Sequence, residues 1–101
     1  MTLDLQTLPL TGPPKRRRDL TVYELDDEAL IFDPQSSDTH RLNATALFIW
    51  RMCDGNNPPQ RIAEALTENY EVGWDSAREH SERILQELHT HGLVTVENDA
   101  A

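Results

Sequence analysis

The sequence predicts an α+β fold in which a three-stranded antiparallel sheet is followed by three helices, an arrangement similar to a winged helix. Three observations lead to this prediction. Short runs of β-forming residues separated by turn-forming residues occupy residues 20–42. The apolar spacing changes to a helical period after Asn43, and Gly55 and Gly92 stand where helices are expected to end. A chain of 101 residues is long enough for one domain with a single modest core.

The strands are expected in the first half of the chain. Residues 21–25 are rich in β-branched and aromatic side chains, and Asp26 and Asp27 after them suit a tight turn. Residues 29–32 are the next apolar strand, and residues 33–38 have the composition of a turn. Residues 39–42 alternate polar and apolar side chains, so we expect a third, shorter strand that completes an antiparallel meander.

The helices are expected after Asn43, which suits an N-cap. Residues 44–53 are apolar nearly all round, which predicts a central buried helix. Asn57 is expected to cap a second helix with one apolar stripe, and Asp75 or Ser76 a third. The third helix has the stripe of an amphipathic surface helix, and a short final strand is expected over residues 93–96.

A basic arm is expected to precede this domain. Residues 1–18 contain Gly12 and three prolines, which argue against a regular element, and they end in the basic run of residues 15–18. Residues 19–101 carry five Arg against seventeen Asp or Glu, a net charge of -12. We therefore expect a flexible arm that folds back onto the acidic body or stays solvated. The alternative is an electrostatic handle for an acidic partner.

Composition limits the classes of function. The net charge of -9 argues against binding nucleic acid through general attraction to phosphates. The single cysteine, Cys53, excludes an intramolecular disulfide and is compatible with a reducing cytoplasm. Residues 1–10 do not have the pattern of a secretory signal, and no apolar run approaches the ~20 residues of a membrane span. We expect a cytoplasmic protein without a membrane partner.

Patterns for catalysis and metal binding are missing from the sequence. The four histidines include no His-x-x-x-His pair, and there is no second cysteine, so no metal site is expected. Cys53 lies in an apolar segment and is expected to be a buried, inert thiol. There is no phosphate-binding loop and no nucleophile motif. The sequence therefore predicts no catalytic residues, no cofactor and no enzymatic activity.

The third strand is the candidate for binding. It is expected at a sheet edge, and an exposed edge accepts an extended peptide through its backbone N–H and C=O groups. The neighbouring helix would supply side chains for specificity. The alternative is that the arm or residues 93–96 cover this edge.

From residue 23 to about residue 94 the sequence resembles the PqqD family of peptide chaperones, also called RiPP recognition elements. The matching segments are residues 23–34, 40–46, 49–50, 53–55 and 85–94. The step from strand to helix at Leu42, Asn43, Ala44 and Thr45 is the most specific of them. Residues 19–101 are accordingly identified as a PqqD-like peptide-binding domain.

The resemblance implies that the leader of a ribosomally made precursor peptide binds as an added strand between the third strand and the third helix. Carried over by position, the strand side consists of Asp38, Thr39, His40, Arg41 and Leu42. On the helix side the expected contacts are Arg78, Ser81 and Leu85. His80 stands where relatives often carry an acidic residue, which puts the usual peptide preference in doubt. The implied partner is a modifying enzyme, commonly a radical-SAM maturase; a link to pyrroloquinoline quinone biosynthesis is one possibility.

Two other functions stay open at this point. A winged-helix DNA-binding protein would need a basic recognition helix, yet the third helix sets Arg78 and Arg83 against Glu79, Glu82 and Glu87. A scaffold subunit of an enzyme complex, without peptide binding, has no sequence feature that separates it from a peptide chaperone. The sequence is compatible with a monomer or a homodimer.

Overall fold

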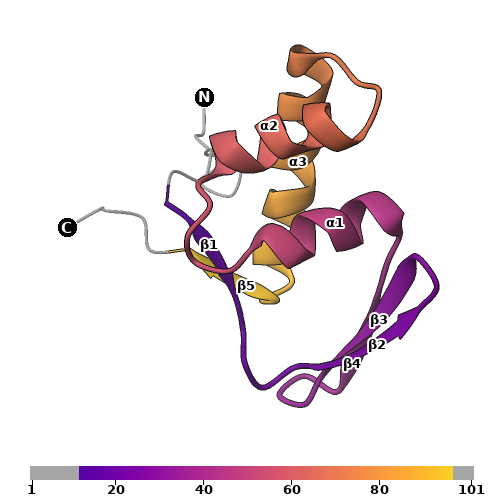
Figure 1. The fold of residues 1–101 in the computed structure, drawn as a ribbon. Helices are drawn as coiled ribbons and strands as arrows, with labels where there is room; N and C mark the ends of the chain where they lie inside the picture. The colour runs from indigo at the N-terminus through magenta and orange to yellow at the C-terminus, as the bar shows by residue number, and fades with distance from the viewer. Residues whose placement is uncertain (1–11, 97–101) are drawn as a thin grey trace, which may run out of the picture.

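The computed structural model describes residues 12–96, in which the sheet precedes the helices (Figure 1). The sheet consists of β2 (Thr21–Leu25), β3 (Glu28–Asp33) and β4 (Asp38–Leu42). The helices are α1 (Ala44–Met52), α2 (Pro59–Asn69) and α3 (Trp74–Thr90). Two short strands, β1 (Pro14–Arg16) and β5 (Val94–Val96), form a separate two-stranded sheet. The predicted α+β class, with three antiparallel strands followed by three helices, is confirmed.

The three-stranded sheet is an antiparallel meander in the order β2-β3-β4, so β4 is an edge strand. A two-residue turn at Asp26 and Asp27 joins β2 to β3. Asp26 has φ 57°, in the left-handed region that short polar side chains tolerate. In the longer turn before β4, Ser37 has φ 63° and donates its backbone N–H to the carbonyl of Asp33 at 2.7 Å.

Alternation along β3 gives the sheet an inner and an outer face. Ala29 and Ile31 are buried on the inner face, where α1 packs against β3 and β4, whereas Leu30 and Phe32 are only partly buried on the outer face. The core continues from the inner face into all three helices and β5. It includes Ala29, Ile31, Leu42, Leu47, Ile49, Trp50, Ile62, Leu66, Leu85, Leu88, Leu93 and Val94.

Helix α1 begins where the sequence predicts. Asn43 is its N-cap, and its side-chain oxygen accepts the backbone N–H of Ala46 at 2.9 Å. Burial on every side, however, is a wrong prediction. Arg51 is exposed, and Phe48 is partly buried, with its ring meeting Tyr70 edge-on at 5.4 Å. A domain of this size has too few elements to cover one helix all round.

Helices α2 and α3 begin at other residues than their capping patterns predict. Pro58 stands at the N-cap of α2, and the side chain of Asn57 bonds to the preceding turn instead. Gly73 is the N-cap of α3, so the predicted caps Asp75 and Ser76 lie inside its first turn. In both cases no side chain caps the helix, and the two helices pack against each other.

The N-terminal segment is part of the fold. Residues 1–11 of the predicted arm lie outside the described residues. Pro14–Arg16 forms β1, which pairs antiparallel with β5, so the expectation that prolines exclude a regular element here is wrong. Pro14 is the first residue of a strand in a two-stranded sheet, a position where its missing N–H is tolerated.

Two arginines of the predicted arm hold this segment in place. Arg16 donates to the carbonyl oxygens of residues 50 and 51, at 3.1 and 2.7 Å, where α1 ends. Arg17 bonds twice to Asp33, at 2.8 and 3.1 Å, and also donates to the carbonyl of Gly92 at 3.0 Å. Its guanidinium lowers the pKa of the Asp33 carboxyl to about 2. The predicted boundary between arm and domain, after residue 18, therefore divides residues that are joined by hydrogen bonds and an ion pair in the structure.

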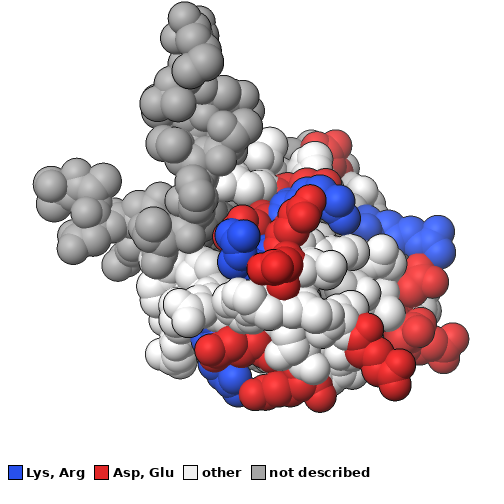
Figure 2. All heavy atoms as spheres, turned by 90° about the horizontal axis from the view of Figure 1, so that it is seen from above, with Lys and Arg blue, Asp and Glu red and all other residues white. Residues whose placement is uncertain are grey.

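Charged side chains are spread over the surface. On the face shown in Figure 2, acidic side chains form several separate groups with basic ones between them. No continuous basic surface of the kind that binds nucleic acid is present on this face. Among residues 12–96, no helix combines the length and the apolar character that a membrane crossing requires.

Candidate functional site

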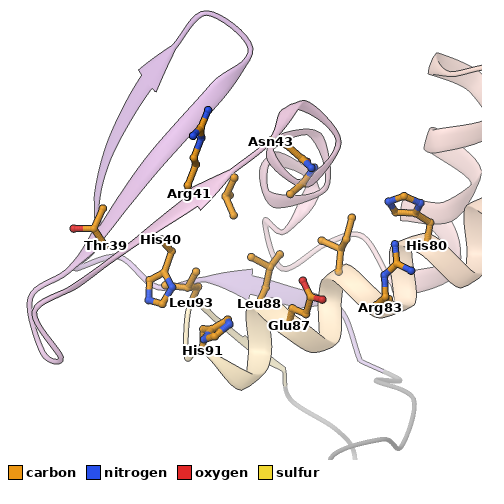
Figure 3. Close-up of a pocket in the computed structure, with 13 residues that line it drawn as sticks. Thr39, His40, Arg41, Asn43, His80, Arg83, Glu87, Leu88, His91 and Leu93 are labelled. Carbon is orange, nitrogen blue, oxygen red and sulfur yellow. The ribbon is translucent and has the colours of Figure 1, made fainter.

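A groove of about 430 Å³ runs between the edge strand β4 and helix α3 (Figure 3). Its floor is apolar and formed by Leu42, Ala46, Ile84, Leu88 and Leu93. Polar side chains stand on both walls. They are Thr39, His40 and Arg41 from β4, Asn43 at the start of α1, His80, Arg83 and Glu87 from α3, and His91 just after it.

The backbone of β4 is open on the groove side. Leu25 and Glu28 close a two-residue turn, so they exchange backbone hydrogen bonds. From Glu28 onward, successive residues of β3 direct their N–H and C=O groups alternately toward β2 and toward β4. Ile31 therefore bonds to His40, its partner in β4. Thr39 and Arg41 then direct their N–H and C=O groups away from β3. Within residues 12–96, no strand pairs with β4 on that side.

The alternative, in which the arm or residues 93–96 cover this edge, is not seen in the described part of the chain. β1 and β5 pair with each other instead of with β4. Leu93 contributes to the floor of the groove without pairing with the edge strand. The edge consequently offers unpaired N–H and C=O groups beside an apolar floor, which is the arrangement that strand addition requires.

The strand residues named from the sequence lie at or next to this groove. Thr39, His40, Arg41 and Leu42 line it, and Asp38 begins the same strand without lining it. Leu42 is buried in the floor. The guanidinium of Arg41 points away from α3 and pairs with the carboxylate of Glu28 at 2.6 Å (Figure 3).

The helix residues named from the sequence lie elsewhere. Ser81 and Leu85 are buried, and the Oγ of Ser81 donates to the carbonyl of Arg78 at 3.2 Å. Arg78 lies beside a different hollow, between α2 and α3, and pairs with Glu82 at 3.5 Å. The structure does not bring these three side chains to the groove. Ser81 and Leu85 belong to the apolar stripe of α3, which packs into the core, and Arg78 faces the hollow toward α2, whereas the groove wall is the stripe next to the apolar one.

The groove wall of α3 follows helical spacing. His80, Arg83, Glu87 and His91 recur every three or four residues, so they lie on one side of the helix. The sequence marked His80 as a departure from its relatives but gave no reason to choose the other three. At one end of the groove the rings of His40 and His91 meet, with centroids 4.9 Å apart (Figure 3).

Cys53, the single thiol of the chain, and the Arg17–Asp33 pair lie outside the groove. Cys53 is fully buried, and burial raises the pKa of its thiol to about 12, so it stays protonated as predicted for an inert thiol. Asp33 and Arg17, whose pKa values also shift, form the structural ion pair described above. No set of three or more side chains with the geometry of a metal site occurs among the described residues.

Comparison with protein families identifies one family. The family model described as coenzyme PQQ synthesis protein D (PqqD) matches residues 28–94 of the chain. This span begins with β3 and ends with the first residue of β5, and it contains the whole groove. The comparison with curated protein sequences finds no significant match.

Solved structures share the fold. TbiB1 in complex with the TbiA(beta) leader peptide is 21% identical, with a TM-score of 0.74 over 84% of this chain and 99% of that one. Lasso peptide synthetase B1 complexed with the leader peptide is 27% identical, with a TM-score of 0.70 over 83% and 99%. The PqqD truncation of Methylobacterium extorquens PqqCD, described as a RiPP recognition element, is 17% identical, with a TM-score of 0.69 over 90% and 99%.

Proposed function

This chain belongs to the PqqD family, and we propose that it is a peptide chaperone for a ribosomally made precursor peptide. It binds the leader of that precursor as an added strand beside β4 and presents the precursor to a modifying enzyme. The chaperone itself performs no chemistry, and the modification takes place on the partner enzyme.

The observation that carries this proposal is the open edge of β4 beside an apolar groove. Thr39 and Arg41 each direct one N–H and one C=O toward the vacant side, which provides backbone partners for an extended peptide. Alternate peptide side chains would then point to opposite faces of the extended sheet. One set enters the groove above Leu42 and Leu88, and the wall of α3 selects among side chains there.

The ligand class is supported by a related solved protein. Lasso peptide synthetase B1, 27% identical to this chain and covered over 99% of its length, is complexed with a leader peptide. We propose the same class of ligand for this chain. On the protein side, the proposed contacts are the backbone of Asp38–Leu42 and the side chains of α3 that line the groove.

The partner enzyme that we propose is a radical-SAM maturase, and the proposed place of action is the cytoplasm. A single buried thiol, with no second cysteine to form an intramolecular disulfide, is compatible with a reducing compartment. A test of this partner is co-purification of the chain with a radical-SAM maturase from the same organism. If the chain assembles with a different class of modifying enzyme, the proposed partner is wrong, but the proposal of leader binding is unaffected.

An NMR titration tests leader binding. The probe is a synthetic peptide with the leader sequence of the cognate precursor. We expect chemical-shift changes over residues 38–42 and along the groove side of α3. The amides of Thr39 and Arg41 should gain protection from hydrogen exchange on binding, whereas the amide of His40 is already protected by its bond to β3. Shifts confined to the outer face, around Tyr23 and Leu25, would refute strand addition at β4.

A further inference from the structure

Most histidines of this acidic chain lie in the groove. Three of the four histidines line it, although it involves only 13 of the 101 residues. The basic residues that line it are His40, Arg41, His80, Arg83 and His91, and of these Arg41 points its guanidinium away from α3. Glu87 is the one carboxylate among the described residues that line it. The whole chain, by contrast, carries 18 Asp and Glu against 9 Lys and Arg.

Arg83 is the arginine of the groove lining that makes no ion pair within residues 12–96. Arg41 is paired with Glu28 on the outer side of the sheet, and Arg78 is paired with Glu82. Arg83 is exposed and makes no ion pair with a carboxylate of residues 12–96. It stands between His80 at one end of the groove and the ring pair of His40 and His91 at the other (Figure 3).

We propose that this groove selects a leader whose strand-forming segment is acidic. The inference rests on the proposed function, because it names the chemistry of the peptide that binds beside β4. Side chains that project to one face of a strand are about 6.8 Å apart. Carboxylates at alternate positions of the peptide would therefore meet Arg83 and the imidazoles in turn along the groove. Charge complementarity of this kind decides partner choice more than it adds affinity.

A selection from random peptides tests the inference without knowledge of the natural precursor. The probe is a displayed library of random peptides about ten residues long, enough to span β4. It is selected on the full chain at about pH 6 and low salt. The recovered peptides are synthesised and placed on the protein by NMR. We expect those that shift residues 38–42 to carry Asp or Glu at alternate positions.

Matched variants then measure the role of charge with one recovered peptide. Arg83→Gln should weaken binding about three- to tenfold. Arg78→Gln, on the same helix but outside the groove, should change the affinity less than about twofold. Glu87→Gln should tighten binding, whereas Glu79→Gln, which is exposed and does not line the groove, should not. These four side chains are exposed, so melting temperatures close to wild type are expected and serve as the control for folding.

The outcomes separate this inference from the proposed function. Peptides that bind at β4 without acidic residues, and with equal affinity for wild type and Arg83→Gln, would overturn the acidic preference and leave the chaperone function standing. Recovery of no peptide that contacts β4 would overturn both. An affinity for acidic peptides that does not fall as salt rises from about 50 to about 500 mM would also contradict the inference, because an attraction between exposed charges is screened in this range.

Discussion

Proline at Arg41 is expected to weaken strand addition while leaving the fold intact. The register directs the N–H of Arg41 away from β3, so its loss removes no bond of the sheet. Proline is tolerated on the outward side of an edge strand. In the complex, however, that N–H would bond to a carbonyl of the leader peptide, and proline has no N–H to donate.

The size of the effect follows from the single backbone bond that is lost. A buried carbonyl left without its partner costs about 1–3 kcal/mol. The dissociation constant should therefore rise by about 5- to 150-fold, since about 1.4 kcal/mol corresponds to a factor of ten. β4 offers two outward N–H groups, at Thr39 and Arg41, so Thr39→Pro should lower the affinity by a similar factor.

Two controls separate the backbone from the side chain and the fold. Arg41→Ala removes the guanidinium and its exposed pair with Glu28 but keeps the N–H, so most of the affinity should remain. His40→Pro removes a bond to Ile31 inside the sheet, so it should lower the melting temperature. Isothermal titration calorimetry with the leader peptide and thermal unfolding are measured for all variants. Equal affinity of Arg41→Pro and Arg41→Ala, with both folded, would refute the open-edge geometry.

Three further predictions concern stability and reactivity. Ile49→Ala should lower the free energy of unfolding by about 2–5 kcal/mol, because Ile49 is fully buried. Phe48→Ala should lower it by less, because the ring of Phe48 is partly exposed. Urea unfolding of both variants measures the difference. The pKa of Asp33 is about 2 in the fold and about 4 in the unfolded chain. Its ionisation therefore stabilises the fold above about pH 4, and this stabilisation is lost as pH falls toward about 2. Asp33→Asn should remove this part of the pH dependence of unfolding, and an unchanged profile of stability against pH would contradict the prediction. Cys53 should react with a thiol reagent only as fast as the protein opens, and rapid reaction of the folded protein would show that the thiol is accessible.

The N-terminal segment shows where local patterns mislead. The run of prolines and basic residues before residue 19 predicts a flexible arm, yet Arg17 binds Asp33, 16 positions away, and Gly92, 75 positions away. β1 likewise pairs with β5 from the other end of the described chain. Neither partner is marked by the residues around Arg17, because a long-range ion pair depends on which turns the fold brings together.

The sequence by itself determined those helices and strands that depend on residues close together in the chain. The strand periods over residues 21–42, the side-chain cap of Asn43 and the end of α3 at Gly92 depend on neighbours within a few residues. The start of α2 departs from this rule, because Pro58 instead of Asn57 stands at its N-cap and no side chain caps it.

Which stripe of α3 faces the groove was decided by the tertiary structure alone. A helical wheel identifies the apolar stripe that contains Leu85, and this stripe is buried as its composition requires. It does not say which of the two flanking polar stripes lies beside β4. That choice depends on how α3 crosses the sheet, which is set by the packing of α2, α1 and β5 against the helix. Arg83 therefore faces the groove and Arg78 does not, although both are exposed arginines on one helix.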